Sequence, residues 1–259
     1  MRYVKAELIK IGKTHFLWVL GASYILIFLL FFSQYTINKD ANVIEPMLKN
    51  PVNLYSFFLL IFSLFFNIVF AVAIGSFLGG KEYSYNTIQI SIQSSGRYKG
   101  TFAGFLTLFI ITSIFIIVIV LLGTTLGLVH TRNLSNFNLR ELINRFVVAL
   151  VSTYLIGLLA MTVSKLLKST SKANIICIIL LLASNVLPYG LSKYLVYFQP
   201  YYYISKYAND SFSNLKGLKS ITFYGENNIS SIMNFMCILL YIGICVTIQI
   251  IIDKKREYV

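Results

Sequence analysis

The sequence predicts an all-α polytopic membrane protein that forms a single transmembrane domain over residues 1–259. Hydrophobic residues make up 57% of the chain and charged residues only 12%, a balance that ordinary soluble domains do not have. The apolar residues gather in runs, and several runs reach the roughly 20 residues that a helix needs to cross a bilayer. From these two observations we expect six transmembrane helices.

The first segment, residues 2–14, predicts a short amphipathic helix that lies in the plane of the membrane interface. On a helical wheel Val4, Leu8 and Ile11 share one face, whereas Ile9 departs from the pattern. The opposite side carries the basic residues Arg2, Lys5, Lys10 and Lys13. Anionic lipid headgroups attract such residues. The alternative is a charged flank that only orients the first span.

The six spans are expected at about 16–35, 54–78, 101–129, 143–167, 173–196 and 231–252. Trp18 and Tyr35 lie near the two ends of the first span, where interfacial aromatic residues are favoured. The third span is long enough to tilt, and Pro188 should bend the outer end of the fifth. A long outer segment, 197–230, precedes the sixth span.

The distribution of basic residues sets the expected orientation. Segments that lie on the same side as the N-terminus carry more Lys and Arg than the segments between them. The positive-inside bias therefore places both termini in the cytoplasm. A short cytoplasmic loop after the fourth span is expected to carry Lys165, Lys168 and Lys172, and Asp253 is expected to begin the cytoplasmic tail. The same bias accounts for the net charge of +13 without nucleic acid.

The polar segment 79–100, between the second and third spans, combines a cationic excess with aromatic residues. Its basic residues Lys81, Arg97 and Lys99 stand against a single acid, Glu82. The segment is long enough to form a small helix and to be held by a soluble partner. However, its isoleucines Ile88, Ile90 and Ile92 alternate with polar residues, which is the period of a strand.

No group of residues in the sequence indicates catalysis. The middles of the expected spans lack charged residues and His, which ion-coupled transport usually needs. The stretch from Gly75 to Lys81 fits the start of a phosphate-binding loop, but Glu82 stands where Ser or Thr would bind magnesium. The cysteines Cys177, Cys237 and Cys245 lie in apolar runs and are expected to be buried. We therefore expect no catalytic residue, no cofactor and no metal on this chain.

Over nearly its whole length the sequence resembles the permease subunits of ABC-2 type exporters. The resemblance rests on the basic N-terminal helix, the six spans and three short motifs. These motifs are Glu82, the pair Asn86 and Thr87 followed by Ser95-Gly96-Arg97, and the turn Pro200-Tyr201 after the fifth span. Asn86 replaces the usual Gly, Gln89 stands where a basic residue is frequent, and the proline often found before Arg97 is missing.

The resemblance implies a cytoplasmic coupling helix in the coupling loop 79–100, which docks on a separate ABC ATPase. The implied ATPase-coupling residues are Lys81, Glu82, Tyr83, Tyr85, Asn86, Thr87, Ile88, Arg97 and Tyr98. ATP and Mg would then be bound by the ATPase subunits. A second permease copy or a paralogue would complete the membrane part.

The expected function is that of the transmembrane permease subunit of an ATP-driven exporter in the plasma membrane of a bacterium. The spans offer apolar and aromatic surface but no charge that matches an ion, which favours amphipathic toxin or antimicrobial peptides, or hydrophobic drugs, as cargo. Pro200, Tyr201, Tyr202 and Tyr203 would form an outer lid. The alternative is a membrane sensor or scaffold that binds a cytoplasmic partner without transport.

Overall fold

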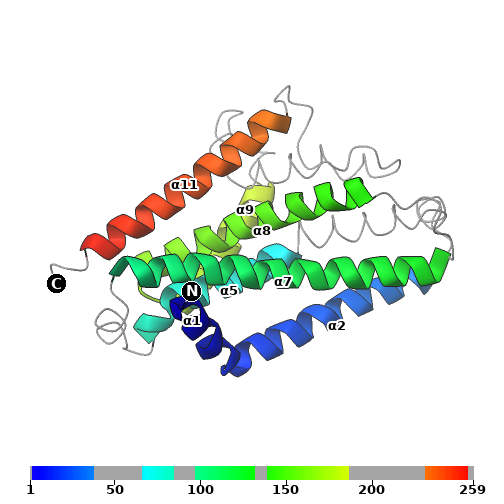
Figure 1. Cartoon of the computed structure of the whole chain (residues 1–259), viewed down its shortest axis with the longest axis horizontal. Helices are drawn as coiled ribbons and strands as arrows, with labels where there is room; N and C mark the ends of the chain where they lie inside the picture. Colours follow the sequence, from blue (N-terminus) through cyan, green and yellow to red (C-terminus); the bar gives the residue numbers. More distant parts are fainter. Residues whose placement is uncertain (1, 38–65, 85–96, 132–138, 187–230, 256–259) are drawn as a thin grey trace.

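The computed structural model describes residues 2–37, 66–84, 97–131, 139–186 and 231–255, and every element in these ranges is a helix (Figure 1). In chain order they are α1 (Arg2–Gly12), α2 (His15–Ile37), α5 (Asn67–Ser84), α7 (Arg97–Thr131), α8 (Leu139–Leu167), α9 (Thr170–Val186) and α11 (Ser231–Lys255). The predicted all-α class is confirmed for these residues.

Three of the described helices are long and apolar enough to cross a membrane. The stretches are Gly100–Leu126 in α7, Phe146–Leu167 in α8 and Ile232–Lys255 in α11. They match the third, fourth and sixth expected spans. A fourth is reached if α1 and α2, which are bent by 71° at their junction, count as one span. α5 and α9 contain shorter apolar stretches, so the full set of six spans remains a prediction.

The breaks between consecutive helices follow from local hydrogen bonding. At the α1–α2 bend the Thr14 hydroxyl donates to the Ile11 carbonyl and Trp18 Nε1 donates to the Gly12 carbonyl at 3.2 Å. α8 ends before Lys168, which has a positive φ of 52°, a common way to stop a helix. The Ser169 hydroxyl then accepts a hydrogen bond from the Lys172 amide at 3.4 Å and caps α9.

α1 has the amphipathic pattern that the sequence predicts. Ile11 is buried, and Lys5, Lys10 and Lys13 are exposed. Ile9, which departs from the pattern, is 49% exposed. The helix is thus confirmed, whereas its position in a membrane interface remains a prediction. The side chain of Arg2 lies outside the described residues.

The directions of the helices can be read from their contacts. Gly75 and Gly79 of α5 approach Gly157 and Met161 of α8, so these two helices are parallel. α8 and α11 are also parallel, because Gln249 contacts Leu158 and Asp253 contacts Lys165. α7 is antiparallel to α8, because Gly104 lies near Met161 and Leu108 near Gly157. α2 is antiparallel to α5, with Phe16 on Phe77 and Tyr24 on Phe70.

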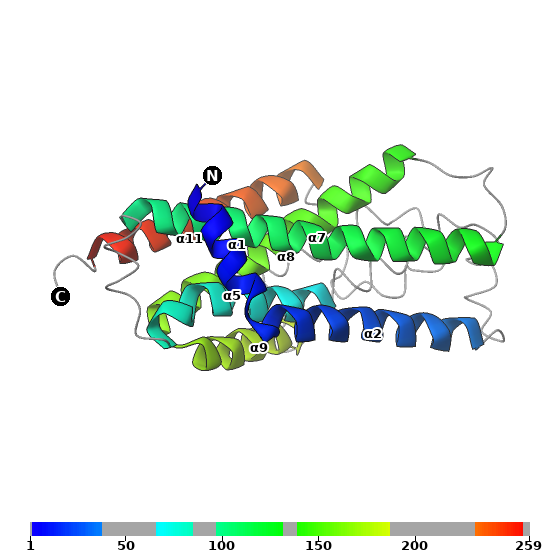
Figure 2. The ribbon, with the colours of Figure 1, turned by 60° about the horizontal axis from the view of Figure 1, so that its bottom comes forward.

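This alternation brings several chain ends together at one end of the bundle. We call it the basal end; it comprises α1, Ser84, Arg97, the turn 168–169 and Lys255. In both ribbon views α1, the start of α7 and the end of α11 lie toward the same end of the molecule (Figures 1 and 2). Both ends of the segment 85–96 and both ends of the described chain are therefore basal.

The structure corrects the expected boundaries of two loops. Residues 79–84 continue α5 and residues 97–100 begin α7, so the segment between them is shorter than the predicted loop 79–100. Lys165 lies inside α8, within the expected fourth span 143–167 although it was also expected in the loop after that span, and Asp253 lies inside α11 rather than in the tail. Charged residues are compatible with a helical backbone, and the pairing of Lys165 with Asp253 offsets the cost of burying both charges.

Candidate functional site

An ion pair joins α1 to the basal end of α5. Lys81 Nζ donates to Glu7 Oε2, and both side chains are largely buried, with exposed fractions of 13% and 15%. Lys10 Nζ also approaches Glu7, at 3.3 Å from Oε1, but its side chain is 65% exposed. The main ionic contact of Glu7 is therefore with α5. The sequence placed Lys81 in a cationic loop facing a partner, whereas the structure gives its amine an intramolecular acid.

The charge state of Glu7 follows from these neighbours. Burial alone would raise the pKa of the Glu7 carboxyl. The positive charge of Lys81 and its hydrogen bond outweigh that effect, with smaller help from Lys10, and the pKa is lowered below its ordinary value of 4.5. At neutral pH the carboxylate is ionised, so the link between α1 and α5 is fully formed.

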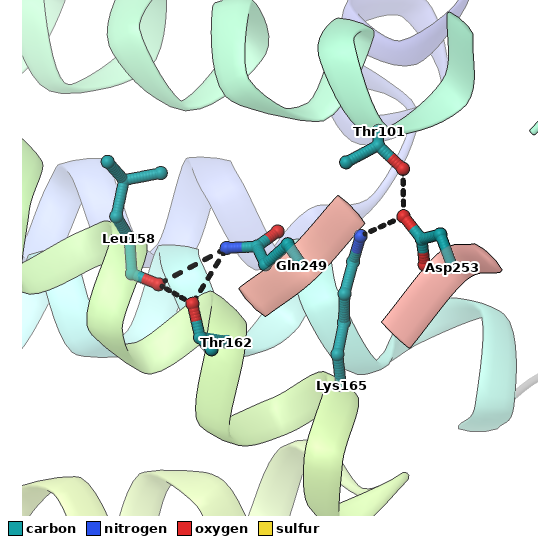
Figure 3. A network of polar contacts seen from close by, with 6 residues as sticks. All are labelled: Thr101, Leu158, Thr162, Lys165, Gln249 and Asp253. Carbon is teal, nitrogen blue, oxygen red and sulfur yellow. Dashed lines mark hydrogen bonds and ion pairs between the residues drawn. The ribbon is translucent and has the colours of Figure 1, made fainter. Parts of the chain in front are cut away.

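A second ion pair joins three helices at the basal end. Lys165 of α8 donates from Nζ to Asp253 Oδ2 of α11 at 2.9 Å, and the Thr101 hydroxyl of α7 donates to the same oxygen. Figure 3 shows Lys165 and Thr101 reaching this carboxylate from two sides. All three residues are buried. A single carboxylate thus ties the start of α7 to the ends of α8 and α11.

One turn further from the basal end, a neutral contact repeats the connection between α8 and α11. Gln249 Nε2 donates to the Thr162 hydroxyl at 2.8 Å and to the Leu158 carbonyl at 3.4 Å (Figure 3). Thr162 itself donates to the Leu158 carbonyl at 2.8 Å. Gln249 and Asp253 are four residues apart and therefore share one face of α11.

The contact between α5 and α8 depends on glycine. A Cβ added at Gly75 or Gly79 would overlap the backbone of Gly157 or Met161. A Cβ at Gly80 would meet Ser164 and Thr170. Small residues at this four-residue spacing let two membrane helices approach closely. The Ser164 hydroxyl adds a hydrogen bond to the Ser76 carbonyl at 2.7 Å.

The predicted coupling residues are only partly described. Lys81 and Tyr83 lie in α5 with partly buried side chains. Glu82 lies in α5, and Arg97 and Tyr98 lie in the first turn of α7, but their side chains are outside the described residues. Tyr85, Asn86, Thr87 and Ile88 lie outside the described ranges, as do Pro200, Tyr201, Tyr202 and Tyr203.

Sequence reasoning missed Glu7, Thr101, Lys165 and Asp253 as site residues. The available signal was an acid at the end of an apolar run, since a charge at membrane depth usually has a partner. The partner could not be read locally, because Lys165 and Asp253 are 88 residues apart.

Comparisons with known proteins add no assignment. No protein-family model matches the chain, and no curated protein matches its sequence. Among the described residues, no three His, Cys, Asp or Glu side chains gather as metal ligands would. The candidate site is therefore defined by its geometry: a partly buried ion pair, Glu7–Lys81, on α5, and a buried ion pair, Lys165–Asp253, that is hydrogen-bonded to Thr101 at the start of α7.

Proposed function

We propose that the chain is the transmembrane permease subunit of an ATP-driven exporter, with separate ATPase subunits docking at the basal end. The observation that carries this proposal is the placement of the two ion pairs. α5, which leads into the segment 85–96, is tied to α1 through Lys81 and Glu7. α7, which leaves that segment, is tied to α8 and α11 through Asp253. A partner that moves the segment would thus act on the bundle through two defined contacts.

The resemblance to ABC-2 type permeases supplies the identity of the partner in this proposal. The coupling residues Glu82, Asn86, Thr87 and Arg97 would dock on the ATPase, which binds ATP and Mg. The exposed lysines of α1 would face the anionic surface of the cytoplasmic leaflet, where basic residues are stabilised. The protein would then lie in the plasma membrane with both termini in the cytoplasm, as a dimer with a second copy or a paralogue.

The chemistry of the described helices supports an amphipathic or hydrophobic cargo. Their outward surfaces are apolar; Phe102, Leu121 and Leu240 are each about three-fifths exposed, at 62%, 58% and 60%. The acidic and basic residues buried in the described spans, Lys165 and Asp253, lie at the basal end and are paired with each other. A cargo of amphipathic toxin or antimicrobial peptides, or of hydrophobic drugs, would enter such a path without an ionic partner.

The proposal is tested by co-expressing the full chain with candidate ABC ATPase subunits of its host and reconstituting the complex in liposomes. We expect the ATPase to co-purify and its ATP turnover to rise with membrane-active peptides. Sodium chloride and sucrose are the control solutes. Stimulation by these controls alone would refute the cargo and leave the exporter architecture standing. Failure of every ATPase to bind or respond would refute the exporter itself.

The coupling role has a separate genetic test. Glu82→Ala combined with Arg97→Ala should leave membrane insertion intact and lower peptide-stimulated turnover about fivefold or more, the lower end of usual coupling between sites. Thr247→Val, on the exposed side of α11, serves as the control. Full activity in the double variant would contradict the assignment of these residues.

A further inference from the structure

The carboxylate of Asp253 is a junction between three helices. Its Oδ2 accepts hydrogen bonds from Lys165 of α8 and from Thr101 of α7, while Asp253 itself belongs to α11. The exposed fractions of the three residues are only 6% to 7%. Lipid and water are therefore kept away from the contact. Such a contact is sensitive to geometry, because displacing Lys165 or Asp253 weakens a buried ion pair and displacing Thr101 removes a hydrogen bond from its carboxylate.

The position of Thr101 connects this junction to the segment 85–96. α7 begins at Arg97, so Thr101 lies only one turn after the chain leaves that segment. A helix transmits a displacement of its first turn along its axis, because its backbone hydrogen bonds are continuous. Any shift of the start of α7 would therefore be felt at Asp253.

α11 depends on this junction for its contact with the rest of the bundle. Only 17% of the apolar stretch of α11 is buried, compared with 61% for α8. The buried residues of α11 follow one face, and most of them are polar: Asn234, Ile238, Cys245, Gln249 and Asp253. At the basal end α11 is thus held by Gln249 and Asp253 rather than by a broad apolar surface.

We propose that Asp253, with Thr101 and Lys165 as its donors, passes displacement of the start of α7 to α8 and α11 during transport. These are positioning residues, and the inference rests on the proposed function. Lys81 and Glu7 form the corresponding link from α5 to α1. A displacement of the segment 85–96 would then reach two parts of the protein: the N-terminal helix α1 and the last helix α11.

If the Lys165–Asp253 ion pair only stabilised the fold, the expected result would differ from that of a pair that transmits displacement. A static pair would only stabilise the fold, so transport by the molecules that do fold would be unchanged once both charges are removed. Lys165→Met combined with Asp253→Leu removes both charges together, a replacement that buried ion pairs often tolerate without loss of stability. The ratio of peptide transported to ATP hydrolysed separates the two roles, because it is independent of protein yield.

The experiment compares variants of the full chain, reconstituted with the ATPase, by that ratio and by ATPase binding. In Lys165→Met/Asp253→Leu and in Thr101→Val we expect normal binding and a transport ratio lowered by about fivefold or more. Thr107→Val is the matched control on the same helix. Thr107 is fully buried, and its hydroxyl has no hydrogen-bond partner among the described residues, so the ratio should stay at the wild-type value.

The outcomes separate this inference from the function on which it rests. If the wild-type chain neither binds nor stimulates an ATPase, the proposed function fails and this inference fails with it. If the wild-type chain couples and both Asp253-junction variants keep its ratio, only the inference is overturned. If Thr107→Val lowers the ratio as much as Thr101→Val, the effect belongs to α7 in general and the junction is again refuted.

Discussion

α5 and α11 both run parallel to α8, but they contact it in opposite ways. α5 lies against α8 through glycines, with backbone almost touching backbone at Gly75 and Gly79. At the basal end, α11 contacts α8 through polar side chains, with Gln249 on Thr162 and Asp253 on Lys165 (Figure 3). In a membrane, lipid is as apolar as Leu, so apolar side chains alone give little reason for helices to associate. The two regions therefore associate by other means: α5 by close backbone packing and α11 by paired polar groups.

The difference has a consequence for how each contact fails. A glycine contact tolerates no added atom, because the neighbouring backbone cannot move aside. A polar contact tolerates a change of size but not the loss of one partner, since the other partner stays buried and unpaired. The α5–α8 contact should therefore respond to bulk, and the α8–α11 contact should respond to charge.

The largest effect is expected from bulk in the α5–α8 contact. Gly75→Leu should destabilise the protein by more than about 3 kcal/mol, because the side chain meets the backbone of Gly157 rather than a side chain that could move. Gly243→Leu in α11 is the control, since nothing lies within 4 Å of the position of its Cβ. Thermal unfolding in detergent, followed by size-exclusion chromatography, measures both. Equal stability of the two variants would show that α5 and α8 are not in backbone contact.

The next effect separates the loss of one charge from the loss of both. Asp253→Leu removes the acid that is paired with the buried Lys165 amine and should cost about 3–5 kcal/mol, whereas Lys165→Met/Asp253→Leu should lie close to wild type. The same unfolding assay reports both. If the double variant is at least as unstable as the single one, the ion pair does not exist in the folded protein.

A smaller effect is expected at the neutral contact of the same two helices. Gln249→Leu removes the two hydrogen bonds that Nε2 donates, to the Thr162 hydroxyl and to the Leu158 carbonyl, but Thr162 still donates to that carbonyl. The expected loss is about 1 to 2 kcal/mol, because each hydrogen bond has a usual net value of about 1 kcal/mol. Thr247→Val, on the exposed side of α11, should change stability less. A loss in Gln249→Leu as large as that in Asp253→Leu would refute the distinction between neutral and ionic contacts.

The smallest effect is a pH dependence of the link between α1 and α5. The pKa of Glu7 is lowered in the folded protein, so its contribution to stability is complete above about pH 4.5 and is lost as the pH falls through the lowered value. Lys81→Gln should remove most of this acid-range dependence, and Lys10→Gln should remove little, because Lys10 is exposed. Unfolding measured from pH 3 to pH 7, in steps of about one pH unit, tests it. If both variants lost the same amount of acid-range pH dependence, Lys81 would not be the main ionic partner of Glu7.

The helices themselves were largely readable from the sequence, because each depends on a local pattern. The 3.6-residue period of Val4, Leu8 and Ile11 predicted α1, and uninterrupted apolar runs predicted α7, α8 and α11. The start and end of these helices were less readable. Lys81 and Lys165 look like loop residues when each charge is considered alone, although both lie inside helices.

The candidate site was not readable, because its partners are far apart in the chain. Glu7 and Lys81 are 74 residues apart, and Thr101 and Asp253 are 152 residues apart. The glycines from Gly75 to Gly80 were interpreted only against a phosphate-binding loop. Their packing role depends on Gly157, and the spacing of Gly75 and Gly79 would have been the useful signal.

Both proposals require the basal end to face the cytoplasm, and cysteine labelling in intact cells tests this most directly. Single cysteines are placed at Ser171, which is exposed beside the α8–α9 turn, and at Asn214 in the expected outer segment. The parent has Cys177, Cys237 and Cys245 replaced by Ala. An impermeant thiol reagent should label Asn214→Cys in intact cells and Ser171→Cys only after permeabilisation. Labelling of Ser171→Cys from outside would contradict the orientation and, with it, the docking of an ATPase at the basal end.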